Sequence, residues 1–289
     1  MARHGMAGRL TRRRILALGA AACLGGGAIY TFGIEPVWLR TVELDVRLKG
    51  LAPEFDGFTI AQLSDFHVGA GVPLDYLHGA AALANEAQPD LVALTGDYVH
   101  RGGDTADTAD AAAILTTLAA PAYAVLGNHD GAVYSSEGRP DRGAVGRVRN
   151  ALEKAGVSVL VNERITLRRG DARLHVAGLG DLWLGAFRPR GVPLRDPEAP
   201  TIALSHNPDT AKDLAGLGAD LILSGHTHGG QVSIPFLGPQ ILPVRHREFA
   251  AGHFDLGGTQ LYVNRGVGWL RRVRLFVRPE VTILRLRAT

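Results

Sequence analysis

The chain has 289 residues, 46% of them hydrophobic, which is enough to bury one large core or two modest ones. Five of its 31 basic residues are arginines within residues 1–14, where there is no acid, so the rest of the chain carries 26 basic against 28 acidic residues. This nearly neutral body argues against a polyanion-binding groove and therefore against nucleic acid as a partner. The single cysteine, Cys23, excludes disulfides within the chain and thiolate ligands or nucleophiles after it.

The N-terminal segment, residues 1–34, has the pattern of an export signal or membrane anchor. Thr11-Arg12-Arg13-Arg14 precedes an uncharged stretch from 15 to 34 that is rich in glycine and alanine. The paired arginines resemble a twin-arginine signal, and a plain signal anchor is the alternative. The stretch reaches the roughly 20 residues that span a bilayer. The arginines before this stretch predict that residues 35–289 lie outside the cytoplasm. The segment would be either cleaved as a signal or retained as an anchor.

Residues 35–289 alternate short apolar strands with polar loops and alanine-rich helices. A half-buried strand is predicted at 41–48 from the alternation of polar and apolar residues. Buried strands are predicted at 58–63, 91–94, 123–126, 202–204 and 221–223, and helices at 74–87, 106–118 and 140–153. Further strands are predicted at 157–161, 165–167, 174–177, 260–263 and 281–286, and a proline-rich loop at 188–200. This order predicts an α/β layered domain.

Each of the five buried strands ends in a loop with polar side chains that suit metal binding or acid–base chemistry. These side chains are Asp65, His67, Asp97, Asn128, His129, His206, His226 and His228. Because the carboxyl ends of parallel strands share one edge of a sheet, we expect the loops to meet at one site. The closely spaced pair His226 and His228 would by itself fit either a metal site or a hydrogen-bonded loop, and the other loops favour metal. Mixed oxygen and nitrogen ligands suit Mn, Fe or Zn.

In order along the chain, these loops resemble the motifs of the calcineurin-like metallophosphoesterase superfamily: Asp65-x-His67, Gly96-Asp97, Gly127-Asn128-His129-Asp130, His206 and Gly225-His226-x-His228. The resemblance implies a four-layer α/β/β/α sandwich with two mixed sheets, formed by residues 35–289. It implies two divalent metal ions, the first held by Asp65, His67 and His228. The second would be held by Asn128, His206 and His226, and Asp97 would bridge both.

The resemblance also implies catalytic roles beside the metals. His129 would protonate the leaving oxygen or stabilise charge on it, and Asp130 would orient the His129 ring. Phosphoprotein phosphatases of the superfamily have a second aspartate three residues after Asp97, where this chain has His100. This departure argues against a protein phosphatase. Arg101 is expected either to contact a phosphate or to form a surface salt bridge.

A narrower resemblance, to a membrane-associated bacterial branch, rests on the basic signal, Glu35-Pro36, Gly229-Gly230-Gln231, Asn264-Arg265-Gly266-x-Gly268 and Arg278-Pro279-Glu280. That branch contains twin-arginine-exported phosphoesterases and enzymes that cleave the pyrophosphate of UDP-2,3-diacylglucosamine in lipid A synthesis. We therefore predict a membrane-associated hydrolase of a phosphodiester, phosphomonoester or pyrophosphate in an envelope or lipid-linked substrate. The alternatives are that pyrophosphatase itself and a non-catalytic, metal-containing envelope-binding protein. His129 favours an enzyme, because a binding protein does not need it.

Three features outside the motifs have two interpretations each. Residues 269–278 interleave arginines with apolar residues, which predicts a strand with one solvated basic face or, alternatively, a contact with lipid headgroups or a phosphate-rich polymer. Trp183 is expected to pack internally or to line the substrate cleft. The histidines without motif spacing are expected to be ordinary surface or hydrogen-bonded residues: His78, His100, His175, His246 and His253.

Overall fold

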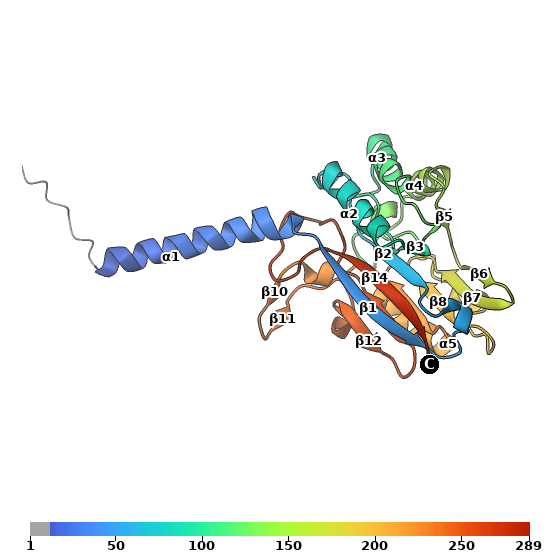
Figure 1. The fold of residues 1–289 in the computed structure, drawn as a ribbon. Coiled ribbons are helices and arrows are strands. Elements are labelled where there is room, and N and C mark those ends of the chain that lie inside the picture. The colour runs from blue at the N-terminus through green and yellow to red at the C-terminus, as the bar shows by residue number, and fades with distance from the viewer. Residues whose placement is uncertain (1–11) are drawn as a thin grey trace, which may run out of the picture.

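Two six-stranded sheets lie face to face in the computed structural model, which describes residues 12–289 (Figure 1). The first sheet has the order β1 (Arg40–Leu48), β14 (Glu280–Ala288), β2 (Thr59–Leu63), β3 (Leu91–Leu94), β4 (Ala122–Ala124), β5 (Ser158–Val159). The second has the order β12 (Gly252–Asp255), β13 (Gln260–Val263), β9 (Leu221–Ser224), β8 (Thr201–Leu204), β7 (Ala172–Gly178), β6 (Glu163–Arg169). Both sheets are mixed, since β14 runs antiparallel to β2 in the first and β6 and β12 are antiparallel edge strands in the second.

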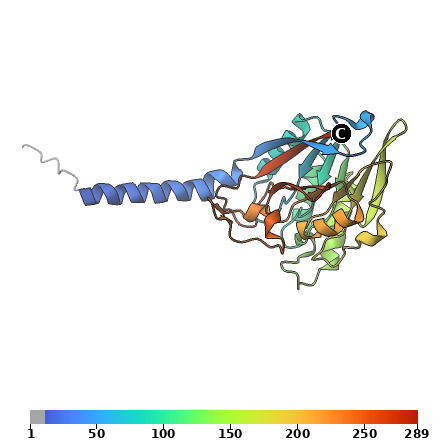
Figure 2. The ribbon, with the colours of Figure 1, turned by 90° about the horizontal axis from the view of Figure 1, so that it is seen from below.

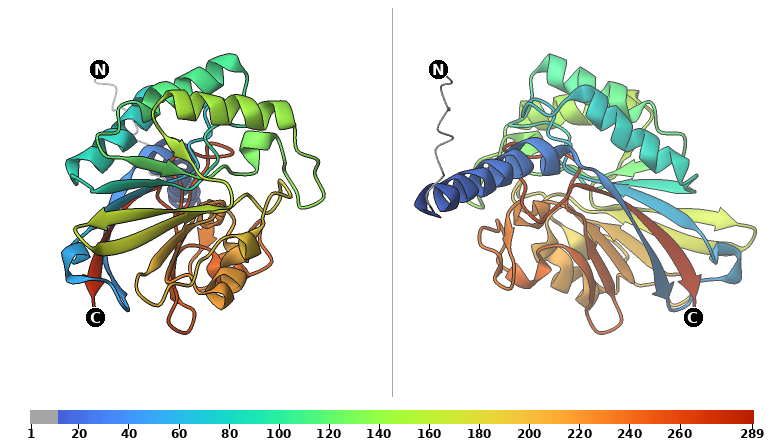
Figure 3. Two further views of the ribbon diagram at one scale, coloured as in Figure 1. Left: turned by 90° about the vertical axis from the view of Figure 1, so that its right-hand side faces the viewer. Right: turned by 60° about the vertical axis from the view of Figure 1, so that its left-hand side comes forward.

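Helices cover the outer face of each sheet (Figure 3). The first sheet is covered by α2 (Leu74–Glu86), α3 (Thr105–Leu115) and α4 (Arg142–Lys154), and the second by α5 (Ala211–Leu217). The three predicted helices are therefore confirmed, and they differ from the observed ones only by a few residues at their ends. The predicted four-layer α/β/β/α sandwich is confirmed.

The core explains why the central strands are apolar on both faces. In β2, Ile60 packs between the two sheets, whereas Ala61 and Leu63 pack under the helices. In β9, Leu221 and Leu223 point between the sheets and Ile222 points toward α5. A strand covered on both sides reads as a continuous apolar run.

The N-terminal helix α1 (Arg12–Ile29) projects from the body (Figure 2). Of the predicted signal, Arg3, Arg9 and Thr11 lie outside the described residues. Within residues 12–289, no helix combines the length and the apolar character that a membrane span requires. After α1 the chain is tied to the body by Glu35, whose buried carboxylate accepts the backbone N–H groups of Phe276 and Val277.

Residues 269–278 do not form the predicted strand, and that prediction was wrong. Instead the segment is an irregular loop with several bends, and Arg274 turns into the protein and is fully buried. Its guanidinium donates to four backbone carbonyls, those of Arg265, Gly266, Gly268 and Val277. The planar guanidinium group of arginine can donate to several acceptors at once. The alternation of charged and apolar residues along the sequence does not reveal this arrangement.

Candidate metal centre

All five polar loops meet at the carboxyl ends of the parallel strands, on one edge of the two sheets. Asp65 and His67 follow β2, Asp97 follows β3 and Asn128 follows β4, all from the first sheet. The second sheet supplies His206 after β8 and the pair His226 and His228 after β9. Backbone hydrogen bonds join neighbouring loops, for example Asp65 N–H to the Gly96 carbonyl and Gly225 N–H to the His206 carbonyl. The two sheets thus present one continuous set of side chains.

The backbone at this edge is strained. Asp65, His67, Asp97, His226 and His228 all have φ between 50° and 71°, a left-handed conformation that residues other than glycine rarely adopt. Such strain costs of order 1–3 kcal/mol for each residue and persists only where the surrounding structure imposes it. Its concentration at five of the seven predicted metal ligands indicates a functional site.

Glycines allow the loops to approach each other closely. A Cβ atom on Gly127 would lie 2.2 Å from Oδ1 of Asp97, and one on Gly225 would lie 2.0 Å from Oγ of Ser64. Any larger residue would push the Asp97 loop or the Asp65 loop away from its neighbour. This requirement explains the glycine that precedes the ligands in two of the motifs.

The first cluster of potential ligands contains Asp65, His67 and His228, all buried. Nε2 of His67 is 3.0 Å from Nε2 of His228 and 3.9 Å from Oδ1 of Asp65, and Nε2 of His228 is 3.3 Å from the same oxygen. Atoms that bind one ion at about 2.1 Å lie about 3–4 Å from each other. These three side chains therefore have the spacing of a shared metal ion.

The second cluster contains Asn128, His206 and His226. Nε2 of His206 is 3.2 Å from Oδ1 of Asn128 and 3.2 Å from Nδ1 of His226. Asp97 lies between the clusters, with Oδ2 3.6 Å from Nε2 of His67 and 3.2 Å from Nε2 of His206. One carboxylate oxygen therefore reaches both groups, as a bridging ligand must.

In the neutral imidazoles of the second cluster, the outer hydrogen bonds place the N–H groups on the outside and the lone pairs on the inside; without a cation, His206 holds a proton at this inner position. Nδ1 of His206 lies 2.7 Å from the Thr95 carbonyl and Nε2 of His226 lies 3.0 Å from the Pro243 carbonyl, so these nitrogens carry the N–H. The Asn128 amide N–H donates to the Val133 carbonyl, which turns its oxygen inward. Lone pairs of two nitrogens and of the Asn128 oxygen then face one another beside the Asp97 carboxylate, an arrangement that a cation stabilises. The residues present fit a divalent metal.

The electrostatics of the site favour positive charge between His206 and Asp97. Burial disfavours the His206 imidazolium, but attraction by Asp97 outweighs it and raises the pKa of His206 to about 10. Burial also opposes ionisation of Asp97, yet His206 and His129 hold the pKa of its carboxyl well below its usual range. Burial lowers the pKa values of His67 and His228, which keeps both rings neutral and able to ligate.

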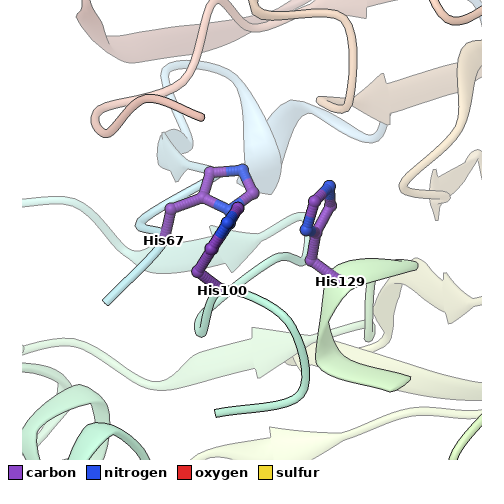
Figure 4. Close-up of side chains that lie close together, drawn as sticks. All are labelled: His67, His100 and His129. Atoms are coloured by element: carbon purple, nitrogen blue, oxygen red, sulfur yellow. The ribbon is translucent and has the colours of Figure 1, made fainter. Parts of the chain in front are cut away.

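Two further histidines, His100 and His129, gather beside His67 of the first cluster (Figure 4). The ring of His100 stacks on His129 with 5.1 Å between centroids and approaches His67 at 5.6 Å. Nδ1 of His100 and Nδ1 of His129 are buried, and neither has a hydrogen-bond partner among the residues that the structure describes. The expectation that His100 is an ordinary surface or hydrogen-bonded histidine was therefore wrong, because its ring packs against His129 and His67 at the centre.

Arg101 lies at the mouth of the site and is exposed. Its guanidinium carbon is 5.6 Å from the centre of the Tyr134 ring, and that ring packs edge-on against His129 at 5.2 Å. The expected surface salt bridge is not among the ion pairs within residues 12–289.

Asp130 does not orient the His129 ring, and this part of the prediction was wrong. Its buried carboxylate accepts four backbone N–H groups, those of Asp97, Tyr98, Val99 and Gly127. Because Asp130 points back into the protein, it fixes the strained loop that carries Asp97. It is a positioning residue for the bridging carboxylate.

Replacing Asp130 by alanine is expected to lower the free energy of unfolding by about 3 kcal/mol or more, since several buried N–H groups lose their acceptor. Urea unfolding in the presence of a chelator measures this effect without a contribution from metal loss. Asp130→Asn is the matched control, because it retains an acceptor oxygen and should cost less. Equal stability of wild type and Asp130→Ala would contradict the assignment.

Sequence reasoning missed Asp181, which follows β7 at the same edge of the second sheet. Oδ1 of Asp181 accepts the N–H groups of Trp183 and Leu184, and Oδ2 is buried without a partner within the described chain. Burial raises the pKa of Asp181 to about 6. A polar residue after a buried strand was the signal that could have identified it. Trp183 itself packs against the His226 ring at 4.7 Å.

Comparisons with known proteins agree with this geometry. Residues 58–230 match the family model described as calcineurin-like phosphoesterase. The chain is 35% identical to phosphodiesterase YaeI of Escherichia coli K12, over 96% of this chain and 99% of that protein. It is 33% identical to the uncharacterized metallophosphoesterase YkuE of Bacillus subtilis 168, over 97% and 99%. UDP-2,3-diacylglucosamine pyrophosphatase LpxG of Chlamydia muridarum is 29% identical, over 89% and 92%. The chain therefore belongs to the calcineurin-like phosphoesterase family of metal-dependent hydrolases.

Proposed function

We propose that this hydrolase uses two divalent metal ions to cleave a phosphodiester, phosphomonoester or pyrophosphate bond of a lipid-linked or envelope substrate at a membrane. The observation that carries the proposal is the position of Asp97, whose Oδ2 lies within 3.6 Å of a ligand nitrogen in each cluster. Asp65, His67 and His228 would hold one ion, and Asn128, His206 and His226 the other. Mn, Zn and Fe suit this mixture of carboxylate, amide and imidazole ligands.

Two ions at this position would polarise the phosphoryl group and lower the pKa of the attacking water. Side chains of the protein would supply the hydrogen-bond donor for the leaving oxygen and the contacts to the other phosphate oxygens. His129 lies beside the first cluster, 4.8 Å from the His67 ring, where its N–H can reach the leaving oxygen. Arg101 and Tyr134 lie over the outer side of His129 and would hold a non-bridging oxygen or a neighbouring phosphate.

The membrane location of the substrate is supported by the N-terminal segment and by the similarity to one relative with a lipid substrate, LpxG. Paired arginines before the apolar residues of α1 are consistent with export of the body across the inner membrane. The similarity to LpxG supports a second candidate, a pyrophosphatase acting on UDP-2,3-diacylglucosamine. The two candidates differ in the membrane face that the site must occupy, so fractionation and protease protection in intact cells separate them.

Chelation tests the metal requirement. Dialysis against a chelator is expected to abolish hydrolysis of bis(p-nitrophenyl) phosphate, and Mn²⁺, Zn²⁺ or Fe²⁺ should restore it, because the ligand atoms remain in place. Elemental analysis of protein from its own membrane fraction should find close to two ions per chain. Undiminished turnover by protein with no detectable metal would contradict the proposal.

A further inference from the structure

An apolar hollow of about 540 Å³ opens directly beside the metal centre, and the chemistry described above does not use it. His226 and His228 form its inner end. Its walls are mainly aliphatic: Val232, Ile234, Ile241, Leu270 and Val273. A phosphate group at the metals would therefore have hydrocarbon-lined space next to it, which suits an ester whose other part is apolar.

The outer wall of this hollow is a small hairpin, β10 (Ser233–Ile234) and β11 (Gly238–Pro239), with an unusually apolar tip. Phe236 is 109% exposed, Leu237 is 71% exposed and Ile241 is 82% exposed. Phe236 also has φ 66°, a conformation that a bulky residue rarely adopts, and it points away from the body. Large apolar side chains gathered at one protruding tip mark an interaction surface, unlike single exposed residues scattered over the protein.

Positive charge surrounds the hairpin, although the body as a whole is nearly neutral. Residues 228–247 and 265–279 contain seven arginines and no acidic residue, and of these arginines Arg274 is buried and Arg265 is paired with Glu280. Arg245, Arg247, Arg271 and Arg272 are exposed, and Arg247 donates to the carbonyls of Pro239 and Gln240 at the base of the hairpin. An apolar tip within a ring of arginines is complementary to an anionic bilayer, whose headgroups are negative and whose interior is hydrocarbon.

The hairpin lies on the side of the body from which α1 leaves (Figures 1 and 2). Val232, just before β10, bridges to Leu275, and the neighbouring Arg274 N–H donates to the Thr31 carbonyl after α1. Exposed apolar residues continue across this junction: Ile29, Phe32, Ile34, Trp38 and Phe276. The hairpin and the segment around the end of α1 thus lie near each other, and both expose large apolar side chains.

We propose that the β10–β11 hairpin enters an anionic bilayer and that the hollow takes up an acyl chain of the membrane lipid whose phosphoester is hydrolysed. This inference rests on the function proposed above and adds how the substrate reaches the metals. The lipid would rise from the bilayer along Ile241 and Leu270, while its phosphate passes from the arginines to the centre. An apolar groove that runs from the bilayer to the metals lets the chain stay out of water during transfer.

A fluorophore attached to the full-length protein tests how deeply the β10–β11 hairpin enters the bilayer. Cys23 is the only cysteine, so Cys23→Ser with Leu237→Cys places one environment-sensitive probe on the hairpin tip. The matched control is Cys23→Ser with Asp171→Cys, on the turn between β6 and β7 at the far end of the body. In vesicles of phosphatidylethanolamine and phosphatidylglycerol, lipids with spin labels on their acyl chains should quench the probe at 237 and not that at 171. Protein that floats with vesicles while the 237 probe stays unquenched would overturn the proposal, as would absence of vesicle binding.

Use of the hollow is tested with p-nitrophenyl alkyl phosphates of increasing alkyl length. Each methylene that is buried contributes up to about fourfold in binding, so kcat/KM for the hexadecyl ester should exceed that for the methyl ester by at least about tenfold in the wild type. Leu270→Asp should reduce this ratio to near one, whereas Leu74→Ser, an exposed residue on α2, should leave it unchanged. A ratio that Leu270→Asp does not change would overturn the proposal. Failure of the wild type to hydrolyse any of these esters with metal present would instead contradict the proposed function, and the quenching experiment would still test the hairpin.

Discussion

Asp97→Ala is expected to abolish metal-dependent hydrolysis of bis(p-nitrophenyl) phosphate, with a loss of at least about a thousandfold in kcat/KM. Oδ2 of Asp97 approaches both ligand clusters, at 3.6 Å from Nε2 of His67 and 3.2 Å from Nε2 of His206. Its removal takes a negative charge from the point where both ions would lie. We therefore expect loss of both metals, measured by elemental analysis after gel filtration.

The metal content and turnover of two other variants are the controls for this prediction. His67→Ala removes an imidazole from the first cluster, and Nδ1 of that ring has no hydrogen-bond partner among the described residues, so this variant should leave about one ion bound in the second cluster. Asp213→Ala removes an exposed carboxylate on α5 and should change neither metal content nor turnover. An Asp97→Ala protein that keeps two ions would show that another group bridges them.

His129→Ala is expected to slow hydrolysis by about 10²- to 10³-fold for a substrate with a poor leaving group, such as glycerophosphoethanolamine. The alkoxide of that substrate needs a proton or a strong hydrogen bond as it leaves. Nitrophenolate does not, so bis(p-nitrophenyl) phosphate should lose much less. The ratio of the two effects, measured at saturating metal, reports the role of the side chain directly. Equal losses for both substrates would show that His129 does not act on the leaving group.

The pH dependence of the His129 effect separates its two candidate roles. Burial lowers the pKa of His129 and attraction by Asp97 only partly offsets it, so the neutral ring is favoured at pH 7. A neutral N–H that stabilises charge remains a donor as pH rises, and the advantage of wild type over His129→Ala should persist in alkali. If the imidazolium were the donor, this advantage would disappear as pH rises through the pKa of His129. His253→Ala, an exposed histidine on β12, is the matched control.

Much of the fold was predictable because its central strands are covered on both faces. Runs such as 91–94 and 221–223 have no alternation that would suggest another arrangement, and both appear as β3 and β9. The segment 269–278 was not predictable in the same way. Its alternating arginines resemble a strand pattern, but Arg274 is drawn inward by backbone carbonyls of the same connection between β13 and β14. Periodicity cannot report a side chain that turns back onto the backbone of its own loop.

The sequence alone determined which loops carry the polar side chains, their order, and the family to which their spacing belongs. These properties are local, since each depends on a strand and the few residues that follow it. Only the tertiary structure decided that Asp97 lies between two clusters, that Asp130 faces the backbone, and that His100 stacks on His129. It also decided that an apolar hairpin stands beside the two ligand clusters, because the contacts that place it join residues far apart in the chain. Such contacts depend on the packing of two sheets against each other, and the order of residues does not record that packing.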